Sequence, residues 1–391
     1  MQYTVNTPEG TKDRLFGECR ERRRVQSALT RLFQSRGYSE VITPEVEYYE
    51  LFIRSGNPLP QESCLKMIDR NGKILVMRPD CTAPIARVAA TTLQNEPLPQ
   101  RFYYNQTIFR SGKAHSGSSS EIVQCGVELI GAPGQKADAE VLALAVDGLS
   151  SCGLSGFHIE LGHVGLFRAL TSALGASEET VERMRVFLEE KNFAALDDLL
   201  EPYGNRAGCA ALRRLAYLFG GTEVLDEARA LAGEVGAAPL RYLESVYRHL
   251  EQAGLGNRVR FDLGLAHELE YYTGLVFRGY TEGAGGAVLS GGRYDSLLSA
   301  FGRGAPAIGF AVNVDAVVET LPPVELPRRK TLIHYEAGQI RRAWDTMEKM
   351  EPGTCELSSC GTLEETVRLA REKGASRVLI LEDEKERVMT L

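Results

Sequence analysis

Apolar residues near the N-terminus follow the spacing of a helix and then change to the spacing of a strand. Val25 and Leu29 lie one helical turn apart on one face, and the pattern stops at Gly37. Residues 40–43 then have an extended pattern that ends before Pro44. The sequence therefore predicts a helix that leads into a strand.

Further along the chain, short runs rich in apolar and aromatic residues have the length of strands. Because antiparallel pairing is the simplest arrangement of such runs, we expect an α+β protein with an antiparallel sheet flanked by helices. The predicted strands are residues 73–77 (KILVM), 101–109 (RFYYNQTIF), 122–130 (IVQCGVELI), 157–161, 259–263, 275–280 and 308–314.

A long block in the middle of the chain has helical spacing throughout. Residues 136–149 form one predicted helix, and residues 178–203 and 209–250 are also helical by pattern. Strand patterns lie on both sides of the block at about 165–255, so we expect it to be a helical insertion. The core domain, residues 1–322, is then discontinuous in sequence.

The C-terminal part begins after a proline-rich segment, LPPVELPRRK, which disfavours helix and predicts a linker. Beyond it, strand and helix patterns alternate. One of these helices is expected to begin at Thr362, with Glu365 three residues later as in a capping box, and to end near Gly374. Residues 328–391 are therefore predicted to form a small α/β domain.

Composition and charge restrict the function classes. The chain has 391 residues, of which 43% are hydrophobic and 25% charged, and it has neither a long apolar run nor an N-terminal signal pattern. We therefore expect a cytoplasmic protein without a membrane segment. The formal net charge is -7, which argues against nucleic-acid binding. Eight cysteines occur without a C-x-x-C pair, so neither a metal site nor a cofactor is expected.

Four separated segments resemble histidyl-tRNA synthetase, a class II synthetase, and they occur in the order found in that family. The resemblance covers most of residues 8–316 and implies the class II synthetase fold, with a dimer interface around Pro44. The segments are PEGTKD at 8–13 with RGYSEVITPEVEYYELFIRSG at 36–56, MRPDCTAPIAR at 77–87 with RFYYNQTIFR at 101–110 and VQCGVELIG at 123–131, LEYYTGLVF at 269–277, and SGGRYDSLLSAFGRGAPAIGFAV at 290–312.

The arginines that this chemistry needs are mostly replaced. Activation of an amino acid by ATP builds up negative charge, which fixed guanidinium groups stabilise. At the positions where the resemblance implies arginine, this chain has Ser120, His267 and Ala316. Arg110 remains from the second motif. The sequence therefore argues against synthetase activity, and no catalytic residue is expected.

The amino-acid pocket that the resemblance implies is largely retained. Acceptors for an ammonium group and polar partners for an imidazole are what recognition of histidine requires. Asp80, Thr82 and Gln124 would hold the α-ammonium group, and Glu128 and Tyr271 the imidazole. Tyr272 would line the site, and Arg110 completes the implied histidine-binding set.

Some of the residues in these segments can also be explained by structure alone. Tyr103 and Tyr104 are interpreted as half-buried strand aromatics, and the glycine-rich GGRYD at 291–295 as structural support. Gln124 and Glu128 lie four residues apart on a predicted strand and therefore face the same side. That arrangement suits a pocket, although a solvated sheet face would give the same pattern.

A family that keeps this fold and pocket but not the arginines is that of the regulatory subunits of ATP phosphoribosyltransferase. Membership would imply a non-catalytic protein whose partner is the short catalytic subunit and whose effector is histidine. The first synthetase motif implies a homodimer core within a larger hetero-oligomer. The alternatives are a divergent histidyl-tRNA synthetase and a synthetase-like tRNA-binding sensor. The C-terminal domain resembles a shortened anticodon-binding domain but has balanced charges.

Overall fold

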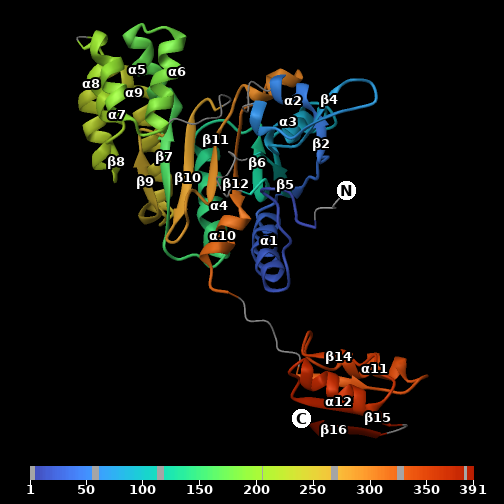
Figure 1. Ribbon diagram of the computed structural model, residues 1–391. Coiled ribbons are helices and arrows are strands. Elements are labelled where there is room, and N and C mark those ends of the chain that lie inside the picture. Colours follow the sequence, from blue (N-terminus) through green and yellow to red (C-terminus); the bar gives the residue numbers. More distant parts are fainter. Residues whose placement is uncertain are drawn as a thin grey trace. The chain divides into compact units, whose positions relative to one another are not determined.

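The structure is a computed structural model that describes residues 5–54, 61–111, 119–204, 206–265, 272–323, 330–382 and 385–391. The chain divides into two compact units, residues 1–322 and 323–391. Figure 1 shows the elements of each unit, coloured from the N-terminus to the C-terminus. Each unit is described by itself.

The first unit is built on one large sheet. Its strand order is β1-β5-β6-β12-β11-β10-β7-β9-β8. The middle of the sheet is antiparallel, as predicted, but β1 pairs with β5, and β7 with β9, in parallel. The strands are β1 (Ser39–Glu40), β5 (Gln100–Phe109), β6 (Glu121–Ile130), β7 (Phe157–His163), β8 (Phe219–Gly220), β9 (Val259–Asp262), β10 (Leu275–Thr281), β11 (Leu289–Arg293) and β12 (Ala307–Asn313).

Helices pack against one face of this sheet and close the main core. α1 (Gly17–Ser35) buries Val25 and Leu29 against strand residues such as Val123 and Val127. The same core contains α4 (Gln135–Ser151) and α10 (Val314–Thr320), which lie beside α1 in Figure 1. The predicted first helix is confirmed, but it begins earlier than its apolar pattern because its first two turns are mostly polar and exposed.

A small second sheet accounts for one predicted strand. Residues 73–77 do form a strand, β4 (Ile74–Met77), but it pairs with β2 (Val46–Tyr48) and β3 (Lys66–Ile68) rather than with the large sheet. α2 (Tyr49–Arg54) follows β2, and a short 3-10 turn, Gln61–Ser63, precedes β3. β2 and β3 were not predicted, because three residues are too few to establish an alternating pattern.

The helical block is present, with breaks that the sequence pattern did not reveal. Lys191 has φ 54, and the Asn192 side chain accepts a hydrogen bond from the Ala195 backbone N–H, which begins a new helix. Gly233, with φ 55, breaks the longest helix. The helices are α5 (Val164–Leu174), α6 (Glu178–Glu189), α7 (Phe193–Leu200), α8 (Cys209–Leu215) and α9 (Glu223–Gln252), with 3-10 turns at Glu201–Tyr203 and Gly256–Arg258.

The second unit is a four-stranded sheet with two helices. Its order is β14-β13-β15-β16, in which β13 pairs in parallel with β14 and β15. The predicted capping box of α12 is confirmed by reciprocal hydrogen bonds between Thr362 and Glu365. The elements are β13 (Thr331–His334), α11 (Ile340–Glu348), β14 (Cys355–Leu357), α12 (Leu363–Glu372), β15 (Arg377–Glu382) and β16 (Lys385–Thr390).

Two further observations concern the cysteines and the apolar character of the helices. All eight cysteines are free thiols. None of the helices within the described ranges has the length and apolar character needed to cross a membrane.

Candidate ligand-binding site

A small pocket lies on the face of the large sheet opposite α1. It is framed by β5, β6, β11 and β12 and by the N-terminus of α3 (Thr82–Ala90). Of the seven residues predicted from the resemblance, six line this one pocket: Asp80, Thr82, Arg110, Gln124, Glu128 and Tyr272. The seventh, Tyr271, lies outside the described residues, as does His267.

Strand geometry explains how β6 contributes two of these residues. Gln124 and Glu128 are four residues apart on one strand, so their side chains leave the same face. Their partners across the sheet are Asn313 and Gly309 of β12. Val123 and Val127, which precede Gln124 and Glu128 directly, face the α1 side and pack in the main core. Of the two explanations that the sequence left open, the structure therefore has the pocket and not a solvated face.

The segment before α3 brings in two further polar groups. Asp80 accepts a hydrogen bond from the Ala83 backbone N–H at 2.9 Å, which fixes its carboxylate at the start of the helix. Two residues on, Thr82 donates from Oγ1 to Glu128 Oε1 at 2.7 Å. The helix start and the strand are thus joined by a direct contact inside the pocket.

Glu128 is the most buried acid of the site. Its side chain is 1% exposed and accepts hydrogen bonds from Thr82 and from the Tyr294 hydroxyl. Burial raises the pKa of Glu128 to about 8, although both hydrogen bonds act in the opposite direction. At neutral pH the carboxyl group is therefore largely protonated and can donate as well as accept a hydrogen bond.

Asp80 and Arg110 supply charges of opposite sign. Burial raises the pKa of Asp80, while the Ala83 hydrogen bond and the nearby Arg110 guanidinium lower it. Arg110 donates from Nε to the Pro79 carbonyl at 2.8 Å, which holds the guanidinium close to the Asp80 backbone. The pocket therefore offers an acid for an ammonium group and a guanidinium for a carboxylate.

Two glycines allow the pocket walls to come this close. A Cβ on Gly309 would collide with the Glu128 carboxylate, and one on Gly292 would lie 2.6 Å from the Tyr272 ring. Gly292 of β11 and Gly309 of β12 are thus needed for packing against the pocket, and for Gly292 this agrees with the interpretation of GGRYD as structural support. The close approach of backbone to side chain, and not a phosphate-binding loop, explains these glycines.

Six lining residues were missed at the sequence level, and three of them carry a hydroxyl group. Tyr104 was interpreted only as a strand aromatic, but it is buried in the pocket wall. Tyr294 belongs to GGRYD and reaches Glu128 with its hydroxyl group, and Ser290 lines the same cavity. The parity of Tyr104 along β5 and the place of Tyr294 directly after β11 were the available signals, but their relation to Glu128 depends on the pairing of distant strands.

The cavity itself is small. Its volume is about 40 Å³, room for one or a few water molecules. A ligand as large as an amino acid therefore requires side chains of the lining to move. Within the described residues, no group of three or more His, Cys, Asp or Glu is placed to hold a metal ion. The polar side chains that line the pocket suit a small polar molecule that carries both an ammonium and a carboxylate group.

Of the three positions where the resemblance implies arginine, two are described. The Ser120 backbone N–H donates to the Gly10 carbonyl at 2.7 Å, and Ala316 lies in the first turn of α10. Neither side chain carries a charge, so neither can neutralise a phosphate.

Comparisons with known proteins agree with this architecture. The family model described as histidyl-tRNA synthetase matches residues 10–317. A protein of Clostridium kluyveri named ATP phosphoribosyltransferase regulatory subunit is 38% identical over 88% of this chain and 90% of its own length. A protein of the same name from Acetivibrio thermocellus is 37% identical over 98% of this chain and 94% of its own length.

A solved structure extends the likeness to three dimensions. It is described as an ATP phosphoribosyltransferase regulatory subunit/histidyl-tRNA synthetase from Bacillus halodurans C. It is 32% identical, has a TM-score of 0.84, and the match covers 97% of this chain and 99% of that one. The predicted fold, a large sheet flanked by helices with a separate small C-terminal sheet domain, is thereby confirmed.

Proposed function

Since the chain belongs to the histidyl-tRNA synthetase family and, within it, to the ATP phosphoribosyltransferase regulatory subunits, we propose that it is a non-catalytic partner of the short catalytic subunit of that enzyme. In this role it does not form phosphoribosyl-ATP itself. It holds the catalytic subunit in an active arrangement at the first step of histidine biosynthesis, in the cytoplasm. Histidine, the end product, binds the chain and lowers the activity.

The proposal is supported most directly by the polar pocket itself, which lies in a chain with uncharged residues at two positions where the resemblance implies arginine. Asp80, Thr82 and Gln124 are the ammonium acceptors of the proposal, and Glu128 with Tyr271 recognises the imidazole. At two of the positions where the resemblance implies a guanidinium group, Ser120 and Ala316 carry no charge that could stabilise ATP-dependent activation. Binding without reaction is the function that such a site can still perform.

The small volume of the pocket also suits a regulatory role. Because the lining must move to admit histidine, the liganded and free states differ in structure around Glu128 and Tyr294. A ligand shifts an equilibrium only by its difference in affinity for the two states. A difference of about 1 to 3 kcal/mol is enough for useful inhibition.

The proposed assembly is a homodimer of this chain within a larger complex. The expectation comes from the segment around Pro44, where several apolar side chains are exposed. Val46 is 41% exposed and Tyr48 49% exposed. Burial of such side chains against a second copy would be favourable.

The decisive measurement is phosphoribosyl-ATP formation from ATP and PRPP by the short catalytic subunit, with and without this chain, over a histidine titration. We expect activity to depend on the chain and to fall as histidine is added. The Glu128→Gln variant should still activate but should need more histidine for inhibition. Glu121→Gln, an exposed position on the same strand, is the matched control and should behave as the unaltered chain.

Absence of both a rate effect and a complex with the catalytic subunit would overturn the proposal. Histidine-dependent exchange between ATP and pyrophosphate would then indicate a divergent synthetase. Salt-dependent retention of tRNA would indicate a tRNA-binding sensor.

A further inference from the structure

A second and larger cavity lies on the α1 side of the large sheet. Its volume is about 460 Å³, within the range of small-molecule sites. It is formed by α1, by the segment that follows β1 and by β5. Its lining includes Arg14, Arg22, Arg23, Arg78, Gln26 and Asn105. None of these residues lines the pocket around Glu128.

Arg78 is the central feature of this cavity. It is only 2% exposed, and its guanidinium donates from Nε to the Thr107 carbonyl at 2.8 Å and from Nη1 to the Thr43 carbonyl at 2.7 Å. In the part of the chain that the structure describes, no carboxylate forms an ion pair with it. Neutral carbonyls satisfy hydrogen bonds but leave the positive charge uncompensated. A buried charge of this kind favours a bound counter-ion.

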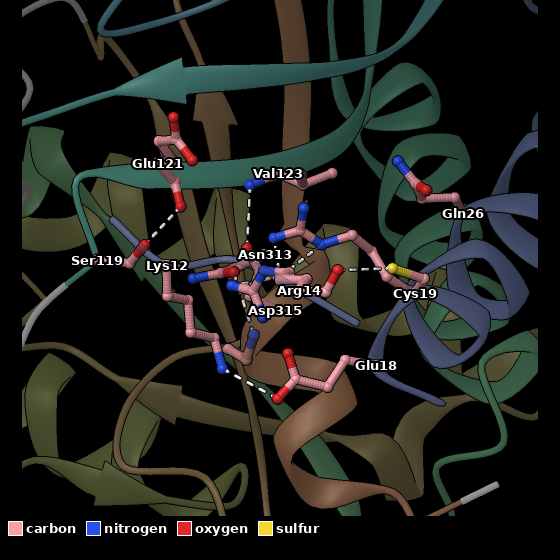
Figure 2. A network of polar contacts seen from close by, with 12 residues as sticks. Lys12, Arg14, Glu18, Cys19, Gln26, Ser119, Glu121, Val123, Asn313 and Asp315 are labelled. Atoms are coloured by element: carbon pink, nitrogen blue, oxygen red, sulfur yellow. Dashed lines mark hydrogen bonds and ion pairs between the residues drawn. The ribbon is translucent and has the colours of Figure 1, made fainter. Parts of the chain in front are cut away.

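The other arginines of the cavity also have too few carboxylate partners to balance their positive charge. Arg14 and Arg22 share a single carboxylate, Asp315, to which Arg22 donates from both Nε and Nη2. Figure 2 shows Arg14 and Asp315 together with Val123, whose backbone N–H donates to the second oxygen of Asp315 at 3.2 Å. Both oxygens of Asp315 therefore have donors, and the two guanidiniums retain one excess positive charge between them.

The remaining charges do not restore the balance. Arg23 lines the cavity and has no ion-pair partner among the described residues, whereas Glu45 is an exposed carboxylate at its margin. Four arginines line the cavity, whereas Glu45 is the one carboxylate of its lining and Asp315 pairs with Arg14 and Arg22 from outside it, in a chain whose formal net charge is -7. A local excess of this sign creates a positive potential inside a concave surface.

We propose that this cavity binds an anion that carries phosphoryl groups, such as phosphate, diphosphate or the phosphate chain of a nucleotide. Arginine forks match phosphate oxygens in two-point hydrogen bonds, and their charge persists at every relevant pH. The volume of about 460 Å³ exceeds what a single phosphate fills, so a diphosphate or longer chain fits the space better. The site is independent of the pocket proposed for histidine.

The test is direct binding by the full chain, measured by isothermal titration calorimetry at constant ionic strength. The probes are inorganic phosphate, pyrophosphate and ATP. We expect saturable binding with one site per chain, strongest for the longer phosphate chains and weakened by added salt. Arg23→Gln, at an exposed position, should weaken binding by about fivefold or more. Arg31→Gln, on the exposed side of the same helix, should leave it unchanged.

Arg78→Gln should weaken binding further, provided that circular dichroism shows a folded protein. If that variant does not fold, Arg23→Gln against Arg31→Gln decides the question. Glu128→Gln should bind all three probes as the unaltered chain does, which separates this site from the histidine pocket.

Three results would overturn the proposal. The first is no saturable binding of any probe up to about 10 mM. The second is equal affinity in Arg23→Gln and Arg31→Gln. The third is an affinity that falls as the chain dimerises, because a second copy would then cover the arginines.

Discussion

Arg293 of β11 and Asp138 of α4 form a buried ion pair in which the guanidinium Nε donates to Asp138 Oδ1 at 2.8 Å. Arg293 is 4% exposed and Asp138 is fully buried. Asp138 Oδ2 also accepts from the Tyr242 hydroxyl of α9 at 2.6 Å. The pair therefore joins the helical insertion to the strand that ends next to Tyr294, a wall of the pocket.

Asp138→Asn should destabilise the protein strongly, because Arg293 would remain buried without its main counter-charge. Breaking one side of a buried pair costs about 3 to 5 kcal/mol in the free energy of unfolding. Urea denaturation followed by circular dichroism measures it. Asp295→Asn is the control, since Asp295 also contacts Arg293 but its side chain is 46% exposed, and its loss should cost about 1 kcal/mol or less. An equal decrease in the free energy of unfolding of both variants would contradict the view that Asp138 is the main counter-charge of Arg293.

Glu128 should make the stability depend on pH. Its pKa is about 8 in the folded protein and near 4.5 when exposed, so the folded state keeps a proton that the unfolded chain has released. The free energy of unfolding should therefore fall as pH rises from about 5 to 8. The Glu128→Gln variant should lose the part of this pH dependence that Glu128 contributes, which corresponds to at most one proton. A slope that is unchanged in the variant would show that Glu128 does not titrate in this range.

Thr82→Val should shift that profile. The Thr82 hydroxyl stabilises the ionised form of Glu128, so its removal should raise the pKa of Glu128 further and extend the pH-dependent window upward. The same denaturation series measures the shift. Thr171→Val removes another buried hydroxyl, one that donates to the Phe167 carbonyl in α5, and should lower stability without moving the profile.

Gly309→Ala should damage the pocket selectively. The added Cβ would meet the Glu128 carboxylate, and forcing it into a packed site costs about 1 to 3 kcal/mol in stability. Histidine binding, measured calorimetrically, should weaken at the same time because Glu128 must move. Gly285→Ala is the control, because no atom lies within 4 Å of its added Cβ. Unchanged histidine affinity in Gly309→Ala would place the ligand elsewhere.

Much of the fold could be predicted from periodicity because the elements concerned are long. β5 and β6, with ten residues each, and α4, with 17, present their pattern several times over. Two- and three-residue strands such as β8 and β3 present it once or not at all. The break at Gly233 was also hidden, because glycine occurs in helices as well as at their interruptions.

The pocket was predictable in its residue types but not in its chemistry. The resemblance indicated which side chains belong together, and the structure places six of them around one cavity. The contact between Tyr294 and Glu128 depends on β6, β12 and β11 pairing in one register, which no local pattern determines. The raised pKa of Glu128 depends in turn on burial by those strands.

The pairing of β6 with β12 also affects when, during synthesis, the protein becomes able to bind its ligand. β6 ends at Ile130, but its neighbour β12 begins only at Ala307, after the whole insertion. During synthesis, one edge of β6 therefore stays unpaired until the second half of the sheet has left the ribosome. Such an edge is prone to pair with other chains. Pairing between strands so distant in sequence is also slow. We therefore expect ligand binding to be among the last properties that the nascent core domain acquires.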